Sequence, residues 1–314
     1  MKQTLAAITL LLILPIPLPA EGVDIEIGAT TAYNRWDPAW NNEKIIMYPP
    51  DMIKIVDTNA PSYPSLEFAS YGPHLAVRFA GQWELSSSFQ YGFVSTKGGG
   101  VALLPDLVYR RFKYAIKLYD VHAGLSYLLF DMMKLFAGVR TEITDYTVSY
   151  RHSRLYLPVE VFRTTMEGRS LHFTPEIGVG VVVPISPILG IHASLAGTFQ
   201  SGSQKANYKN SFSQSGPEFK MQRIPAARYY GIGLNSSISL RCAIPVINTT
   251  ISFGGFYRLL RYMQKSSRRG IHDLDGSLDQ IFGCSASVSY HFSFAEKKSR
   301  RVWIPRPRYD QRLH

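Results

Sequence analysis

The sequence predicts an all-β protein built from antiparallel hairpins, and three observations support this prediction. Apolar and polar residues alternate along several stretches of the chain. Short turns and long polar connections follow these stretches in alternation. Aromatic residues make up 13% of the chain, with 19 Tyr and 17 Phe, whereas only 18% of residues are charged. Side chains of a strand point alternately to opposite faces, so this alternation indicates sheets with one apolar face.

The N-terminal segment is typical of a secretory signal peptide. Lys2 is the only charged residue among the first twenty, and it precedes an apolar run from Leu5 to Leu14. A stretch interrupted by prolines then ends at Ala20. This order matches the basic, apolar and cleavage regions of an export signal. We expect residues 1–20 to be removed on export; an uncleaved helical anchor is the alternative.

The clearest strand lies between Phe282 and Phe294. Its even-numbered positions are apolar, whereas its odd-numbered positions are Gly, Ser or His. Aromatic residues gather at its end: Tyr290, Phe292 and Phe294. A lipid-facing band that finishes in an interfacial aromatic girdle has this pattern.

Similar alternation and the turns between the stretches predict ten strands along the chain. No helical spacing fits these stretches. The expected strands are residues 23–34, 68–79, 82–94, 119–130, 134–147, 170–183, 188–200, 227–241, 247–260 and 281–294. Short turns are expected near 80–81, 131–133, 184–187 and 243–246, and long polar loops at 34–65, 95–119, 146–170, 201–227 and 261–280.

Two segments leave the number of strands open between eight and twelve. Leu155–Phe162 fits an inward-running strand followed by a turn at Glu167-Gly168. Val108–Leu118 fits another strand, although its basic centre also suits a loop or short helix. Gly98–Gly100 is expected to form a flexible loop tip.

The sheet is expected to close and to span a membrane. No window after the first segment approaches 18 consecutive apolar residues, so no spanning helix is predicted. Backbone N–H and C=O groups in hydrocarbon must all be paired, which leaves a closed sheet as the spanning structure. We therefore predict a closed antiparallel up-and-down transmembrane β-barrel over residues 21–294, with the short turns and both strand termini in the periplasm.

Charged residues of both signs fall on the predicted inner face. They are Arg78, Glu84, Arg140, Glu142 and Glu176. Side chains largely fill the interior of a barrel of about ten strands. An internal ion-pair network is therefore expected in preference to a conduction path, and a narrow pore for small solutes is the alternative.

The final strand resembles that of bacterial outer-membrane barrel proteins, in which a terminal aromatic residue is part of the assembly signal. The matching residues are Tyr290, Phe292 and, in the terminal position, Phe294. Leu155–Phe162 and Phe173–Val183 also look like segments of small barrels of the OmpW and opacity-protein type. The resemblance implies the outer membrane of a diderm bacterium, with outer-membrane lipid and the barrel-assembly machinery as partners.

The sequence departs from this resemblance after Phe294. Residues 295–314 carry seven Lys or Arg against Glu296 and Asp310, a net charge of +5. We expect these residues to form a basic periplasmic tail. The remaining basic clusters lie in expected loops and strand ends, without a recognition helix, so nucleic-acid binding is not expected.

No motif for catalysis, a cofactor or a metal is found. His122, His192 and His291 fall on inward faces and are expected to be polar lumen residues. Asp273, Asp275 and Asp279 lack the spacing of a calcium loop, and a solvated loop is expected there. Cys242 and Cys284 are placed on the outer face of non-adjacent strands, so no disulfide is expected.

The sequence therefore favours a non-enzymatic outer-membrane barrel. Its function is expected to be that of a surface adhesin, a structural protein or a narrow small-solute channel, with a host or surface ligand reached through the extracellular loops. One alternative is a soluble periplasmic or secreted lipocalin-like binding protein, whose apolar face would point inward. An outer-membrane enzyme is a third class, but no residue cluster in the sequence requires it.

Overall fold

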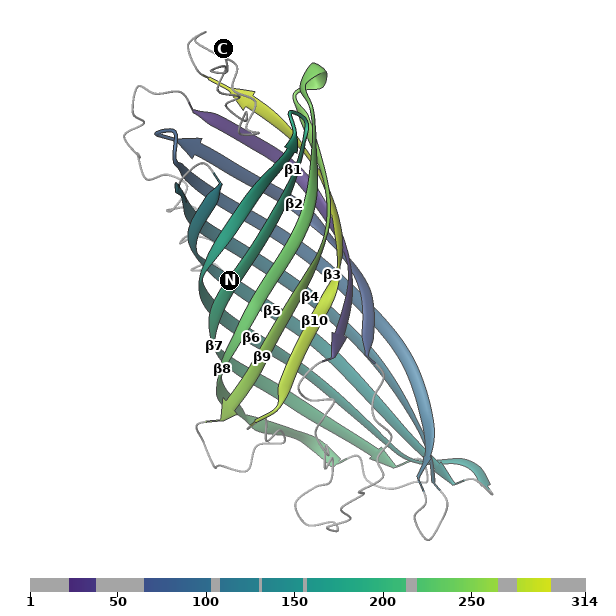
Figure 1. Cartoon of the computed structure of the whole chain (residues 1–314). Helices are drawn as coiled ribbons and strands as arrows, with labels where there is room; N and C mark the ends of the chain where they lie inside the picture. Colours follow the sequence, from purple (N-terminus) through teal and green to yellow (C-terminus); the bar gives the residue numbers. More distant parts are fainter. Residues whose placement is uncertain are drawn as a thin grey trace, which may run out of the picture.

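The described residues form ten antiparallel strands that close into a barrel (Figure 1). The computed structural model describes residues 23–37, 65–102, 108–129, 132–154, 157–212, 219–264 and 276–294. Around the barrel the strands follow the order β1-β10-β9-β8-β7-β6-β5-β4-β3-β2, so each strand pairs with its neighbours in sequence. The predicted all-β fold, its closure and the count of ten strands are confirmed.

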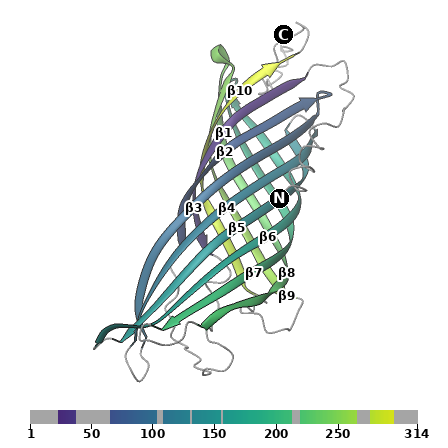
Figure 2. The ribbon, with the colours of Figure 1, turned by 180° about the vertical axis from the view of Figure 1, so that it is seen from behind.

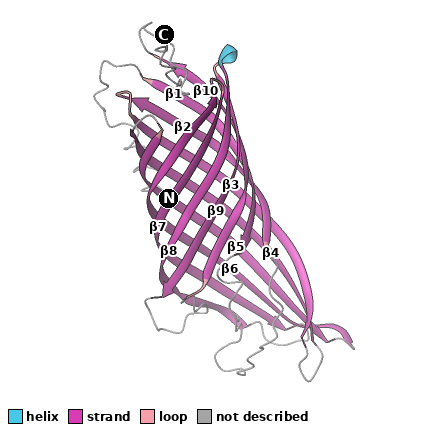
Figure 3. Ribbon diagram, viewed as in Figure 1, coloured by secondary structure: helices cyan, strands magenta, loops and turns pink. Residues whose placement is uncertain are grey.

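The strands differ widely in length. Their bounds are β1 (Asp24–Asp37), β2 (Leu66–Phe79), β3 (Trp83–Ala102), β4 (Val108–Leu129), β5 (Met133–Arg154), β6 (Leu157–Ser186), β7 (Leu189–Phe212), β8 (Phe219–Ile244), β9 (Thr249–Gln264) and β10 (Leu278–Ser293). A single helical turn, η2 (Pro245–Ile247), connects β8 to β9 within the described residues (Figure 3).

The barrel closes between its first and last strands. β1 and β10 pair without a register shift from Asp24↔Ser293 to Asp37↔Gln280. Beyond the last strand, the Phe294 N–H donates to the Val23 carbonyl at 2.9 Å. The two strand ends therefore lie at the same end of the barrel, as an even number of antiparallel strands requires.

The outer surface of the barrel is apolar. Val288, Leu234 and Phe292 are 54%, 50% and 43% exposed. Large apolar residues are exposed on every strand, among them Ile27, Tyr71, Phe89, Leu125, Leu135, Ile177, Leu195, Ile238 and Phe253. A soluble binding barrel would bury these side chains, so the lipocalin-like alternative is excluded. The outward face is a lipid-facing belt.

Short connections gather at one end of the barrel. Ala80 and Gly81 adopt positive φ angles of 50° and 68° in the turn between β2 and β3. At η2 the chain reverses through Asn248, whose φ is 48°. The predicted turns near 80–81, 184–187 and 243–246 are confirmed, whereas that at 131–133 lies partly outside the described residues.

The predicted long loops between β3 and β8 are wrong in extent, because most of their residues are in strands. Gly98, Gly99 and Gly100 are not a loop tip: they pair with Phe112, Arg111 and Arg110. Val108–Leu118 belongs to β4, with no loop or helix at its basic centre. Glu167 and Gly168 lie within β6, with no turn. Figures 1 and 2 show these strands running past β1, β2, β9 and β10 at one end.

The strands continue beyond the lipid without apolar alternation for a physical reason. Beyond the lipid, at the end away from the short turns, the outer face of a strand meets water. Polar residues there occupy outward positions that would be apolar within the lipid. On β4, Lys117 is exposed and lies further from the short turns than Tyr119. On β6, Arg169 is exposed and lies further from them than Leu171. The alternation that identifies a lipid-facing strand therefore ends where the membrane ends, while the sheet continues.

Two predictions fall on residues outside the described part. Residues 1–20 and 295–314 are among them, so the signal peptide and the basic tail stay predictions. Within the described residues, no helix is long and apolar enough to cross a membrane.

The apolar belt predicts a depth-dependent cost for a buried charge. Val288 lies near the middle of the outward apolar run of β10, so Val288→Arg is expected to reduce the free energy of unfolding by about 2–4 kcal/mol. The same change at Ser95, an exposed outward residue beyond the apolar run of β3, should cost about 0–1 kcal/mol. Urea unfolding in lipid vesicles measures both. Equal losses at the two positions would contradict the lipid-facing assignment.

Candidate functional site in the barrel lumen

A charged cluster crosses the lumen at the end with the short turns. Its centre is Glu26 on β1, which is 4% exposed. Arg78 Nη2 lies 3.2 Å and Arg241 Nη2 3.5 Å from its carboxylate oxygens. The Ser289 hydroxyl donates to the same carboxylate at 2.8 Å. Strands β1, β2, β8 and β10 therefore meet at one buried carboxylate.

Through Glu84 on β3, the same cluster extends along the inner face to β5. Arg78 Nε donates to Glu84 Oε2 at 2.7 Å. Lys134 on β5 donates to the other oxygen of Glu84. Arg78 thus bridges two carboxylates, and the contacts run continuously from β8 to β5. Opposite charges in contact offset the cost of removing each one from water.

A second contact crosses the lumen directly. Arg258 on β9 donates to Glu142 on β5 through two nitrogens, at 2.5 and 3.2 Å. Three strands separate β5 from β9 around the barrel. Glu142 is 3% and Arg258 6% exposed, so this two-pronged ion pair is shielded from water.

Polar contacts flank this pair. His122 Nε2 lies 2.8 Å from Glu176 Oε1, and Asn235 Nδ2 donates to Glu176 Oε2 at 3.3 Å. Arg140 Nη1 lies 3.3 Å from Asp120 Oδ2. These contacts join β4, β5, β6 and β8 on the inner face.

An apolar cluster lies on the inner face, on the side away from the turns. Trp36 belongs to it and donates from Nε1 to Asp279 Oδ1 at 3.1 Å. The buried members of this Trp36 cluster are Trp36, Leu66, Phe68, Val94, Ile116 and Ile281. Ile281 pairs with Arg258 in register, so the cluster adjoins the Glu142–Arg258 bridge.

The structure places the sequence-predicted charges in separate contacts. Arg78 and Glu84 contact each other, whereas Glu142 pairs with Arg258 and Glu176 with His122. Arg140 contacts Asp120. The sequence reasoning missed Glu26, Arg258 and the Trp36 cluster. Trp36 falls in the predicted loop 34–65 and Leu66 just before the predicted strand 68–79, although the period-two order of Leu66, Phe68 and Ser70 is a usable signal.

Other predicted residues are placed as follows. Asp279 is buried in β10, so the expectation of a solvated loop is wrong for this residue; Asp273 and Asp275 lie outside the described part. Tyr290 and Phe292 are exposed with ring centroids 4.7 Å apart, and Phe294 is exposed below them. Cys242 and Cys284 are free thiols on β8 and β10. Among the described residues, no group of His, Cys, Asp and Glu could hold a metal ion.

Comparisons with known proteins give distant structural similarities. The outer-membrane protease OmpT of Escherichia coli has a TM-score of 0.46 at 9% identity, covering 88% of this chain and 98% of that chain. The translocator domain of the autotransporter NalP of Neisseria meningitidis has a TM-score of 0.40 at 10% identity, covering 93% and 94%. The toluene transporter TodX of Pseudomonas putida has a TM-score of 0.32 at 9% identity, covering 86% and 89%. No family model and no curated protein matches the sequence.

These similarities are too distant to define the class of protein, and the barrel itself defines it. The sheet closes on itself, its outer face carries large exposed apolar residues all the way round, and its inner face is charged. A closed antiparallel barrel with this distribution is the architecture of outer-membrane proteins. The chain is an outer-membrane β-barrel protein.

The Glu142–Arg258 bridge predicts a strong dependence on both partners. Glu142→Gln leaves a buried guanidinium without its counter-charge, so we expect a loss of about 3–5 kcal/mol in the free energy of unfolding. The control is Asp145→Asn on the same strand, which breaks the exposed contact of Asp145 with Arg169 (2.5 and 2.8 Å). That change should cost about 0–1 kcal/mol. A Glu142→Gln protein as stable as the control would show that the bridge does not hold the wall together.

Proposed function

We propose that this protein is a non-conducting outer-membrane barrel that acts through its extracellular end, as a surface adhesin or structural protein. The observation that carries the proposal is the Glu142–Arg258 bridge across the lumen. It favours a closed barrel over the narrow solute channel that the sequence left open. The charged cluster at Glu26 and the Trp36 cluster support the same conclusion from either side of the bridge.

The energetics of the bridge argue against a pathway that opens by itself. A solute that passed between Glu142 and Arg258 would have to separate two buried charges. Separating such a pair leaves each charge uncompensated, at a cost of several kcal/mol per ion. The charges of a conducting pore are instead in contact with water, as in the wide lumen of porins.

The long strands support a role at the cell surface. A tilted strand crosses the bilayer with about 9–11 residues. β5, β6 and β8 have 22, 30 and 26 residues. A large part of each strand therefore projects beyond the lipid, at the end away from the short turns. A projecting sheet is a rigid platform for contact with an extracellular partner or with neighbouring surface molecules.

Conductance separates the closed barrel from the channel. In planar bilayers we expect no current above background from the unaltered protein. A variant with alanine at Trp36, Glu142, Arg258, Glu26 and Arg78 removes the bridge, the charged cluster at Glu26 and the tryptophan of the apolar cluster, and it should give discrete current steps. The control, Asp145→Ala with Arg169→Ala, removes an ion pair from the outer face and should stay silent. Stepwise opening of the unaltered protein would refute the closed lumen.

Orientation tests the surface role separately. An epitope inserted between Phe212 and Phe219, at the end with the long strands, should bind antibody on intact cells. The same epitope at Val246, which is 93% exposed in the turn between β8 and β9, should bind only after the outer membrane is permeabilised. The reverse result would place the long strands in the periplasm and exclude a surface role.

A further inference from the structure

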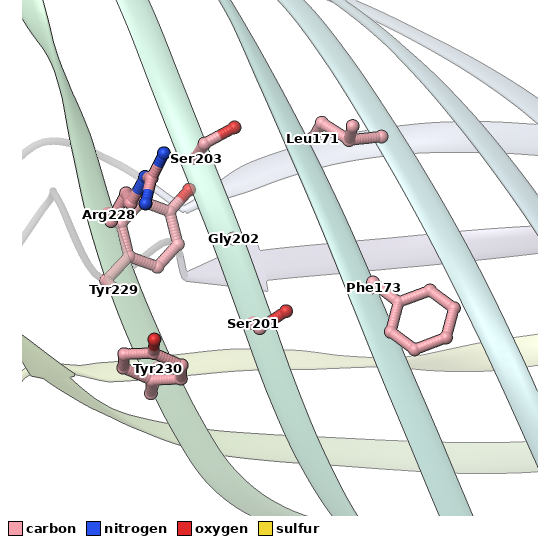
Figure 4. Close-up of a pocket in the computed structure, with 8 residues that line it drawn as sticks. All are labelled: Leu171, Phe173, Ser201, Gly202, Ser203, Arg228, Tyr229 and Tyr230. Atoms are coloured by element: carbon pink, nitrogen blue, oxygen red, sulfur yellow. The ribbon is translucent and has the colours of Figure 1, made fainter.

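A groove of about 280 Å³ runs along the outer wall of the barrel between β6 and β8 (Figure 4). Its floor is the run Ser201-Gly202-Ser203 on β7. Leu171 and Phe173 on β6 form one side, whereas Arg228 and Tyr230 on β8 form the other. The groove exists because small side chains stand between large ones. Leu171 and Phe173 are 47% and 49% exposed, so the groove faces outward.

The groove lies at the extracellular boundary of the apolar belt. On β6 the outward residues are apolar from Phe173 to Ile185, toward the short turns. In the other direction, Arg169 is the first exposed charged residue. On β8, Tyr230 tops the apolar run and Arg228 follows it. The part of the groove near Phe173 and Tyr230 therefore lies at the depth of the acyl chains, and the part near Arg228 lies at the depth of the headgroups.

Basic residues gather along this boundary beside the groove. Lys117, Asp145, Arg169 and Lys205 pair in register across β4 to β7. Arg228 pairs with Ser203, and Arg261 lies outward on β9. This row contains five cationic side chains and one carboxylate, so its net charge is +4. Asp145 engages Arg169, but within the described part of the chain neither Lys205 nor Arg228 forms an ion pair.

The charge of this row is concentrated on one side of the barrel. At the same boundary on the opposite side, Arg35 on β1 pairs in register with Glu67 on β2, so their charges cancel. Tyr33 donates to Glu67 at 2.6 Å. An anionic ligand at the membrane surface is therefore drawn to the groove side.

We propose that the groove binds a phosphorylated glycolipid of the outer leaflet. One acyl chain lies along Leu171, Phe173 and Tyr230, over the floor of small residues, and a phosphate contacts Arg228 and Lys205. The arrangement suits a lipid with several phosphates and chains, because Arg169 pairs in register with Lys205 and adds a third cation beside the groove. The inference rests on the orientation in the proposed function, with the long strands at the cell surface, but it does not require the adhesin or structural role.

The test measures binding of bisphosphorylated lipid A to the purified full-length protein in detergent by native mass spectrometry. We expect the double variant Lys205→Gln with Arg228→Gln to bind about 30-fold more weakly, because each interfacial cation contributes about fivefold. The control variant Arg35→Gln with Lys117→Gln removes the same charge at the same depth, away from the groove. It should change affinity by less than about threefold. Equal losses in both variants would overturn the site and leave only diffuse attraction.

The groove itself has an independent test. Ser201→Phe fills the floor from the outer face without entering the lumen, and it should weaken lipid A binding at least about tenfold, as expected when the acyl chain loses its contact area. Unchanged affinity would overturn the groove as the acyl site. Dephosphorylated lipid A and phosphatidylglycerol should both bind more weakly than the bisphosphorylated form. Equal binding of phosphatidylglycerol would overturn the assignment to a glycolipid. Heat-modifiable gel mobility confirms that each variant is folded.

Discussion

Pairing of every backbone N–H and C=O group inside hydrocarbon is the constraint on which this structure depends. The pairing of β1 with β10, which closes the barrel, satisfies this constraint, because the two strands pair from Asp24↔Ser293 to Asp37↔Gln280 without a shift. An open edge at that seam would leave a row of polar groups in lipid, each costing several kcal/mol. Closure in turn gives the two faces of every strand different surroundings. The outer face meets lipid, and the inner face encloses a lumen that side chains from opposite walls are able to bridge.

The lumen contacts follow from this enclosure. Glu26, Glu84 and Glu142 are surrounded by the wall, and each finds a cation from another strand. The Glu142–Arg258 bridge connects strands with three others between them, so it ties opposite walls together as well as neighbours. The Trp36 cluster adds apolar packing next to it. Side chains from opposite walls therefore bridge the interior, and for this reason the proposed function is placed at the strand ends away from the short turns.

Sequence reasoning identified the part of the fold that lipid imposes. In β10, residues 282–292 alternate because one face must be apolar, and the structure orients Val288 and Phe292 outward. The same reasoning failed above the membrane, where Lys117 and Arg169 sit in strands whose outer face meets water. It also failed for the partners of inward charges. Glu142 is recognisable as inward from the alternation around it, but its pairing with Arg258 depends on how the strands are staggered around the barrel. Two-residue alternation contains no information about that stagger.

Site-directed spin labelling along β10 tests the lipid-facing assignment most directly. A nitroxide placed in turn at positions 284 to 291, in a background without other cysteines, reports collisions with oxygen, which is enriched in lipid, and with a water-soluble nickel complex. In vesicles we predict that oxygen collisions peak at positions 284, 286, 288 and 290, and fall at the positions between them. Nickel collisions should stay low throughout the run. Oxygen accessibility without a period of two, or with its maxima at 285, 287 and 289, would contradict the account.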